Sequence, residues 1–240
     1  PDWWETRYWG STTNQNGSGD ADGEGLSNSN EYHYATSPLV TDTDGDGYSD
    51  SYEINSGSDP RNTSLIPRFS ISGTISYSGS QTGVVRVIAA TVSNAWSSAY
   101  SVTLSGPAAY SVTNLPALSN YWVKAWRDSN GNGSNDSSEA VGVYGSNPVN
   151  LTTNVSGINI TLSDPDSDGD GLFDFVETGT GIFVGPQNTG SNPNDVDSDD
   201  DGINDGTEVN SRTNPNNSDT NGPAITVTFP VNDYTRLVFP

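Results

Sequence analysis

The chain has 240 residues, and 30 acidic residues against eight basic ones give it a formal net charge of −22. This charge excludes DNA and RNA as natural partners, because contacts to phosphate need basic side chains. No stretch approaches 18 consecutive apolar residues, so the sequence predicts no membrane span. With 31% hydrophobic residues and no cysteine, the composition borders on disorder unless something other than a large core or disulfides stabilises the fold.

Residues 1–65 carry the first two copies of an acidic loop. The clearer copy runs from Asp42 to Glu53 and places oxygen-bearing side chains at loop positions 1, 3, 5, 9 and 12, with glycine at position 6. This is the ligand order of an EF-hand calcium loop. The other copy, Asp20 to Glu31, has Glu at position 5 and Asn at position 9. We interpret residues 1–5 as positions 8–12 of a further loop whose front half is missing.

Residues 66–163 have a different pattern, in which β-branched and aromatic residues alternate with polar ones. Six stretches of this kind, separated by Gly, Pro, Ser and Asn, predict about seven short strands and a β-sandwich. Trp122 and Trp126, two of the six tryptophans, are expected to fill the sandwich. A third acidic loop, from Asp128 to Glu139, is inserted after the strand at 121–127 and has Asn at positions 3 and 5.

Residues 164–222 return to the loop pattern, with strict copies at 166–177 and 197–208. Short helical turns are expected at 50–54 and 173–178, and one short strand at 181–185. Residues 223–240 alternate again and predict one or two strands. The predicted fold class is mainly β: one sandwich of about seven strands flanked by irregular calcium-loop modules with short helical turns, plus a C-terminal strand.

The loop chemistry favours calcium. Hard divalent cations need six to eight oxygen ligands, and a tight turn lets alternate residues point inward. Zinc and copper prefer His or Cys, and the chain has one His and no Cys. The predicted ligands, with position 7 acting through its carbonyl, are Asp20, Asp22, Glu24, Leu26, Asn28, Glu31, Asp42, Asp44, Asp46, Tyr48, Asp50, Glu53, Asp128, Asn130, Asn132, Ser134, Asp136, Glu139, Asp166, Asp168, Asp170, Leu172, Asp174, Glu177, Asp197, Asp199, Asp201, Ile203, Asp205 and Glu208.

A plain acidic surface, such as that of a halophilic protein, is the alternative explanation. It would scatter its carboxylates, whereas 22 of the 30 acidic residues here occupy ligand positions of these five loops. We therefore expect about five or more Ca²⁺ ions. Because no entering helix precedes the loops, the ions are expected to stabilise the structure and not to act as a switch. Weak sites of this kind suit an extracellular or cell-surface location.

The loops resemble thrombospondin type 3 and related bacterial calcium repeats, in which similar loops are joined by short linkers containing proline. Here the linkers contain Pro60, Pro193 and Pro215. The resemblance implies that the aspartates ligate calcium and that a series of ions replaces much of the hydrophobic core. Residues 66–163 resemble transthyretin-like or carboxypeptidase-regulatory-like sandwiches.

Three functions follow as hypotheses. The first is a structural subunit of a filament, a homopolymer in which residues 223–240 are donated as a strand to a neighbouring copy. The alternative is a rigid spacer or stalk of a larger adhesin or secreted protein. The third, an enzyme or carbohydrate-binding module, is disfavoured, since the acidic residues are mostly in loops and the one histidine, His33, is expected to pack or lie at the surface.

Overall fold

The computed structural model describes residues 1–13 and 16–218. The chain divides into two compact units, of which the first comprises Pro1–Asn135 with Val141–Ser163 and the second Asp136–Ala140 with the chain from Asp164. The strands predicted for residues 223–240 lie outside the described residues. None of the helices in the described part has the length and apolarity that crossing a bilayer requires.

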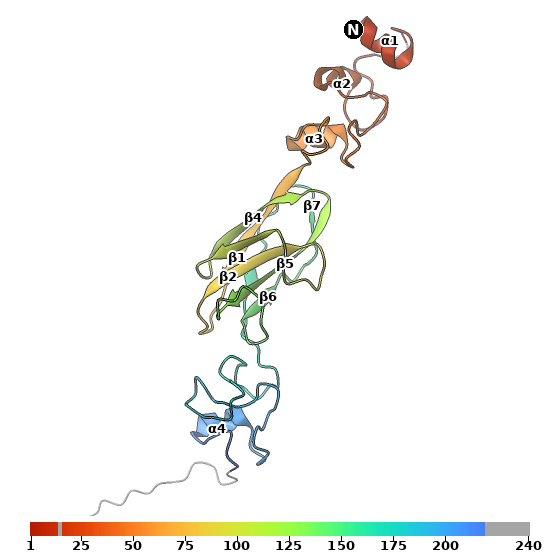
Figure 1. Cartoon of the computed structure of the whole chain (residues 1–240). Coiled ribbons are helices and arrows are strands. Elements are labelled where there is room, and N and C mark those ends of the chain that lie inside the picture. Colours follow the sequence, from red (N-terminus) through yellow and green to blue (C-terminus); the bar gives the residue numbers. More distant parts are fainter. Residues whose placement is uncertain (14–15, 219–240) are drawn as a thin grey trace, which may run out of the picture. The chain divides into compact units, whose positions relative to one another are not determined.

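Three short helices precede the strands in the first unit (Figure 1). They are α1 (Asp2–Trp9), α2 (Asn28–Tyr34) and α3 (Asp50–Ser56). Helices α2 and α3 both begin at loop position 9, where a serine at position 8 supplies an extended N-cap residue, and both end at a left-handed residue. The predicted turn at 50–54 is thus the start of α3. Trp4 packs edge-on against Trp9 and Tyr32, at 5.3 and 5.7 Å between ring centroids, so α1 and α2 share an aromatic cluster.

Eight strands form two sheets in the first unit (Figure 1). One sheet has the order β4-β1-β8, and the other has the order β3-β2-β5-β6 with β7 also paired to β5. Strands β1 and β8 are parallel, and the other pairs are antiparallel. The strands are β1 (Arg68–Ser76), β2 (Val84–Ala90), β3 (Ser101–Leu104), β4 (Ala109–Pro116), β5 (Ser119–Asp128), β6 (Val141–Val143), β7 (Val149–Leu151) and β8 (Ile160–Thr161).

The count therefore differs from the expected seven or so strands. Strand β4 was missed because its apolar positions are separated by exposed Ser, Thr and Asn, including Asn114 with a φ of 64°. Strands β6 and β7 have three residues each, which is too short for a period-two pattern to stand out. Contacts join the sheets through β2 with β4, β3 with β4 and β6 with β8. The sandwich arrangement itself stays a prediction.

Alternation along the paired strands β2 and β5 places one apolar set on each face. Val87, Val123 and Ala125 are fully buried on one face. The tryptophans lie on the other face, where Trp126 packs with Ile88 and Ala90 while Trp122 is half-buried. The expectation for the tryptophans is therefore corrected: Trp126 fills a separate apolar cluster, on the side of the strands opposite Val123 and Ala125.

The second unit has one helix, α4 (Asp205–Ser211), among its described residues. Its apolar cluster is small and consists of Leu172, Val176 and Val209, with two half-buried phenylalanines against them. A short turn lies within residues 173–178, as expected, and does not continue into a helix. The strand expected at 181–185 is absent, and these described residues carry one isolated bridge instead. Gly179 and Gly181, both left-handed, lie where the two segments meet.

Gly73 in β1 offers a direct test of how tightly the first unit is packed. A Cβ at this position would lie 1.9 Å from the carbonyl oxygen of Ile158, whereas one at Gly106 would meet nothing within 4 Å. We expect Gly73→Ala to lower the free energy of unfolding by about 1–3 kcal/mol, the usual cost of overpacking, and Gly106→Ala to change it little. Denaturant unfolding in saturating Ca²⁺ measures both; equal effects of the two variants would contradict the packing shown at Gly73.

Candidate metal centre

Each loop is held in shape by its first acid. The Asp42 carboxylate accepts the amide N–H groups of Gly45 and Gly47 at 2.7 and 2.8 Å. Asp20 and Asp166 accept the amides at positions 4 and 6 of their own loops in the same way, at 2.8–3.3 Å. These bonds curl the chain around one point, so the loop geometry is set by residues only a few positions apart.

This curl requires left-handed backbone at two positions. Position 6 is glycine in every loop, with φ between 82° and 100°. Position 4 is also left-handed, with φ between 75° and 81° at four glycines and 60° at Asp200. The sequence-based prediction identified only position 6, although glycine at position 4 in four of the five loops was a visible signal. Glycine adopts this region without steric cost, and Asp is among the residues that tolerate it best.

Carboxylate oxygens gather inside four loops. One oxygen from each acid of a group lies within 4.8 Å of the others in the groups Asp22–Glu24–Glu31, Asp42–Asp44–Asp46, Asp166–Asp168–Asp170 and Asp197–Asp199–Asp201. In three of these loops the clustered acids are positions 1, 3 and 5, and their role as ligands stays a prediction. In the loop at 20–31 the group consists of positions 3, 5 and 12.

Several of these oxygens are buried without a hydrogen-bond partner. The same atom recurs at position 3, where Oδ2 is unpartnered in Asp22, Asp44, Asp168 and Asp199. Position 12 repeats the pattern: Glu31, Glu53 and Glu208 have both oxygens unpartnered, and Glu177 has one, while all four side chains are at most 3% exposed. A buried charge without a partner is strongly unfavourable. A cation bound between positions 3 and 12 would satisfy these atoms, so the residues present fit a hard divalent ion such as Ca²⁺.

Position 9 has a different partner in the structure. Asp50, Asp174 and Asp205 each accept both the N–H and the hydroxyl of the residue at position 2, which is Thr43, Ser167 or Ser198, at 2.6–2.9 Å. Asn28 instead donates its amide to the carbonyl of Asn16 at 2.9 Å. The position-9 side chain therefore braces the front of its own loop, and its expected role as a ligand there stays a prediction.

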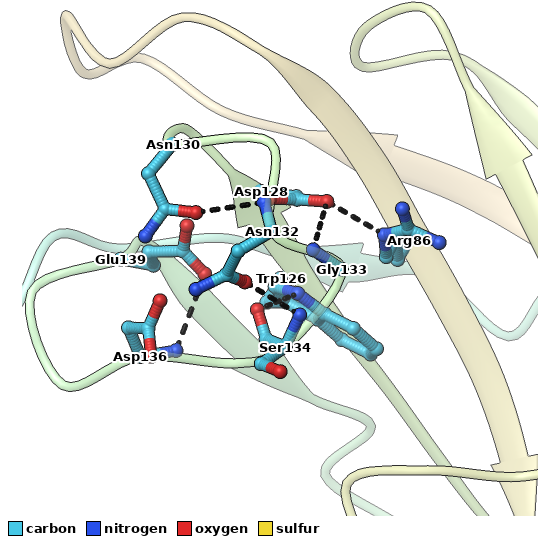
Figure 2. Close-up of polar contacts among 9 residues, drawn as sticks. All are labelled: Arg86, Trp126, Asp128, Asn130, Asn132, Gly133, Ser134, Asp136 and Glu139. Carbon is cyan, nitrogen blue, oxygen red and sulfur yellow. Dashed lines mark hydrogen bonds and ion pairs between the residues drawn. The ribbon is translucent and has the colours of Figure 1, made fainter.

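The loop that starts at Asp128 differs from the other four (Figure 2). Strand β5 ends at Asp128, whose Oδ2 accepts the Arg86 guanidinium at 2.8 Å and the Gly133 amide at 3.0 Å. Burial of Asp128 favours its neutral form, but the hydrogen bond and charge of Arg86, together with the amide hydrogen bonds of Gly133 and Gly131, outweigh burial and lower the pKa of the carboxyl. The guanidinium of Arg86 is thus already paired with the carboxylate at position 1 of this loop.

The expected ligand oxygens at positions 3 and 7 of this loop also accept hydrogen bonds from the protein. The side-chain oxygen of Asn130 accepts the amide of Asn132 at 2.9 Å, and the carbonyl of Ser134, the expected position-7 ligand, accepts the Trp126 indole N–H at 2.9 Å. Asp136 and Glu139 belong to the second unit, where the Asp136 amide donates to the Glu139 carboxylate at 3.2 Å. Because this loop has fewer carboxylates and a resident guanidinium, we expect it to bind a cation more weakly than the other four loops.

Burial makes the closing glutamates poor acids in the metal-free protein. Burial, with added repulsion from neighbouring carboxylates, raises the pKa of Glu31 to about 8 and of Glu53, Glu177 and Glu208 to about 7. Burial also raises the pKa of the four position-3 aspartates. Protons and Ca²⁺ therefore compete for the same oxygens.

Calcium binding should release protons at pH 6. In the metal-free protein the four glutamates are largely protonated at that pH, and the bound ion requires carboxylates. A carboxyl whose pKa rises on folding stabilises the fold below its ordinary value of 4.5, and this stability is lost as the pH rises through 7–8; calcium affinity should increase over the same range. Titration calorimetry in buffers of different ionisation enthalpy measures the release. Binding without proton release at pH 6 would contradict the placement of these glutamates.

Comparison with known proteins supports the loop assignment. Two segments, residues 42–63 and 197–218, match the family described as the bacterial TSP3 repeat. Each begins at position 1 of a strict loop and extends beyond its proline linker. These segments are similar to calcium-binding repeats, which confirms that part of the resemblance. No curated protein and no solved structure matched the chain, and the likeness of residues 66–163 to a sandwich family stays a prediction.

Proposed function

We propose that this chain is a calcium-stabilised structural protein of the extracellular space or cell surface, in which ions held by acidic loops take the place of a large core. The recurrence of buried, unpartnered oxygens at positions 3 and 12 of four loops carries the proposal. Ions that satisfy those atoms contribute their binding free energy to folding. No catalytic role is part of the proposal; the one histidine, His33, is exposed on α2.

A structural role for the ions is supported by how the loop at 42–53 joins the sheets. Tyr48, at position 7, donates its hydroxyl to the carbonyl of Ala117 at 3.0 Å, and Tyr52 in α3 donates to the carbonyl of Thr152 at 3.0 Å. The two rings are stacked with centroids 6.1 Å apart. A sensor needs a helix on each side of its loop to move, whereas this loop is hydrogen-bonded to the residues that directly follow β4 and β7. These contacts favour a rigid spacer.

Removal of calcium should therefore destabilise the protein. A ligand at about 100 times its dissociation constant adds about 2.7 kcal/mol per site, so EDTA should lower the melting temperature strongly. Asp44→Asn removes one charge and one ligand at position 3 and should reduce the calcium-dependent gain. Asp59→Asn is the matched control, because Asp59 is a half-buried residue outside the loops whose carboxylate contacts the amide and the guanidinium of Arg61, at 3.2 and 3.5 Å. A melting temperature that does not change on addition of EDTA would refute the structural role of the ions.

Assembly of copies into a filament is the finer proposal. It is supported by the alternating apolar pattern of residues 224–231, since an unpaired apolar strand gains by joining another sheet. Electron microscopy with Ca²⁺ should show fibres that fray in EDTA, and deletion of residues 224–240 should abolish them while calcium binding persists. Monodisperse monomers at high concentration in Ca²⁺ would favour the spacer of a larger surface protein.

A further inference from the structure

A fifth group of acidic side chains lies between two loops of the second unit. Asp170 and Glu177 come from the loop at 166–177, and Asp205 comes from the loop at 197–208. One oxygen from each lies within 4.8 Å of the others, and the three residues are 9%, 3% and 0% exposed. The described residues from 164 onward contain one basic side chain, Arg212, so protein cations contribute little to neutralising this group.

One member of this group has an oxygen that no protein atom satisfies. Glu177 accepts the Ser191 hydroxyl through Oε1 at 3.1 Å, but its Oε2 is buried without a hydrogen-bond partner. Asp170 and Asp205 are both held in place: Asp170 accepts the amides of Leu172 and Gly206 at 2.7 Å, and Asp205 accepts the N–H and hydroxyl of Ser198. Three fixed carboxylates with an unsatisfied oxygen among them indicate a cation site.

The packing of α4 on the preceding loop creates this site. The Gly206 amide, at loop position 10, donates to Asp170, at position 5 of the preceding loop. A Cβ on Gly206 would lie 2.3 Å from the Asp170 carbonyl oxygen, so the close approach depends on glycine. This approach brings Asp205, the neighbour of Gly206, to the carboxylates of the other loop.

The first unit repeats the same contact. The Ser51 amide, also at position 10, donates to the position-5 carboxylate of Glu24 at 2.7 Å, and the Ser51 hydroxyl donates to the Glu24 carbonyl at 2.7 Å. Asp50, the counterpart of Asp205, is among the charges that raise the pKa of Glu31. The first acids of the two loops are 22 residues apart here (20 to 42) and 31 apart in the second unit (166 to 197), so linker length does not dictate the contact.

A difference between the leading and following loops agrees with this arrangement. Glu31 and Glu177, which close the leading loops, each belong to a group of three clustered acids, whereas Glu53 and Glu208, which close the following loops, belong to none among the described residues. Each of these leading loops accepts an amide hydrogen bond from the helix of the next loop.

We propose that Asp205 supplies an oxygen to the calcium ion of the preceding loop, so that the sites at 166–177 and 197–208 form a coupled pair and not two independent loops. This inference rests on the proposed calcium function. Asp205 is the first residue of α4, and it also accepts the hydrogen bonds of Ser198 at position 2 of the loop at 197–208. An ion bound to Asp205 would therefore hold both the first residues of that loop and α4 in place.

The occupancy of each loop can be measured separately by NMR. The Gly171 amide donates to Asp166 at 3.3 Å and the Gly202 amide to Asp197 at 2.8 Å, so each amide resonance reports the ion in its own loop. We expect Asp205→Asn in the full chain to weaken Ca²⁺ binding at Gly171 by at least about tenfold, since changes even to groups that only support a ligand cost about 10–100-fold.

Two variants control for charge and for the brace. Asp200→Asn removes the same charge from the same loop at an exposed residue with a φ of 60° that suits Asn, and should change binding at Gly171 by less than about twofold. Ser198→Ala removes the hydroxyl that braces Asp205 but keeps the carboxylate, and should weaken binding at Gly171 less than Asp205→Asn does. An effect of Asp205→Asn confined to Gly202, or reproduced in full by either control, overturns the inference.

Failure of the proposed function has a different signature. If neither Gly171 nor Gly202 shifts with Ca²⁺ in the unmodified protein, calcium binding itself is refuted, and the inference with it. If Asp205→Asn does not fold, Asp50→Asn in the first unit decides: the inference expects weaker binding at Gly25 of the leading loop, with Asp59→Asn as the charge control. If Asp50→Asn weakens Ca²⁺ binding at Gly47 and not at Gly25, the inference is overturned.

Discussion

Repulsion between closely spaced carboxylates is the constraint on which the structure depends. Two unit charges 4–5 Å apart repel by about 3–4 kcal/mol at an effective dielectric constant of about 20, and each of four loops holds three acids this close. Backbone amides satisfy position 1, but Oδ2 at position 3 and at least one oxygen at position 12 remain unpartnered in four loops. Only protonation or a cation removes the repulsion, and near neutral pH a bound Ca²⁺ does so with more oxygen contacts than a proton provides.

The chain therefore combines two modes of stabilisation. The strands of the first unit bury apolar side chains in the usual way, and Ile71, Val87 and Leu115 are 0% exposed. The loops of the second unit bury three apolar side chains around α4, alongside Asp174, Glu177, Asp205 and Glu208, which are each at most 5% exposed. A region that buries as many carboxylates as aliphatic side chains cannot be stabilised by the hydrophobic effect alone.

What the sequence predicted follows from the range of each interaction. The acids at positions 1, 3, 5 and 12 could be assigned because they lie within twelve residues of one another. The brace at position 9 was missed, although hydroxyls at position 2 accompany acids at position 9 at 42–53, 166–177 and 197–208, and the loop at 20–31 has Ala21 with Asn28. The pair of Arg86 with Asp128, 42 residues apart, and that of Gly206 with Asp170, 36 apart, depend on tertiary packing that no local pattern shows.

The loop at 128–139 shows how a neighbouring strand alters the charge balance of an acidic loop. It keeps the left-handed glycines Gly131 and Gly133 and the amide bond to position 1, so its curl is that of the other loops. It begins where β5 ends, and β2 beside it supplies Arg86. A guanidinium fixed by a strand performs part of the neutralisation that an ion performs elsewhere, and Asn at positions 3 and 5 leaves less charge to neutralise. The other four loops form no ion pair with a basic side chain among the described residues, and their larger number of acids leaves more negative charge for a cation to neutralise.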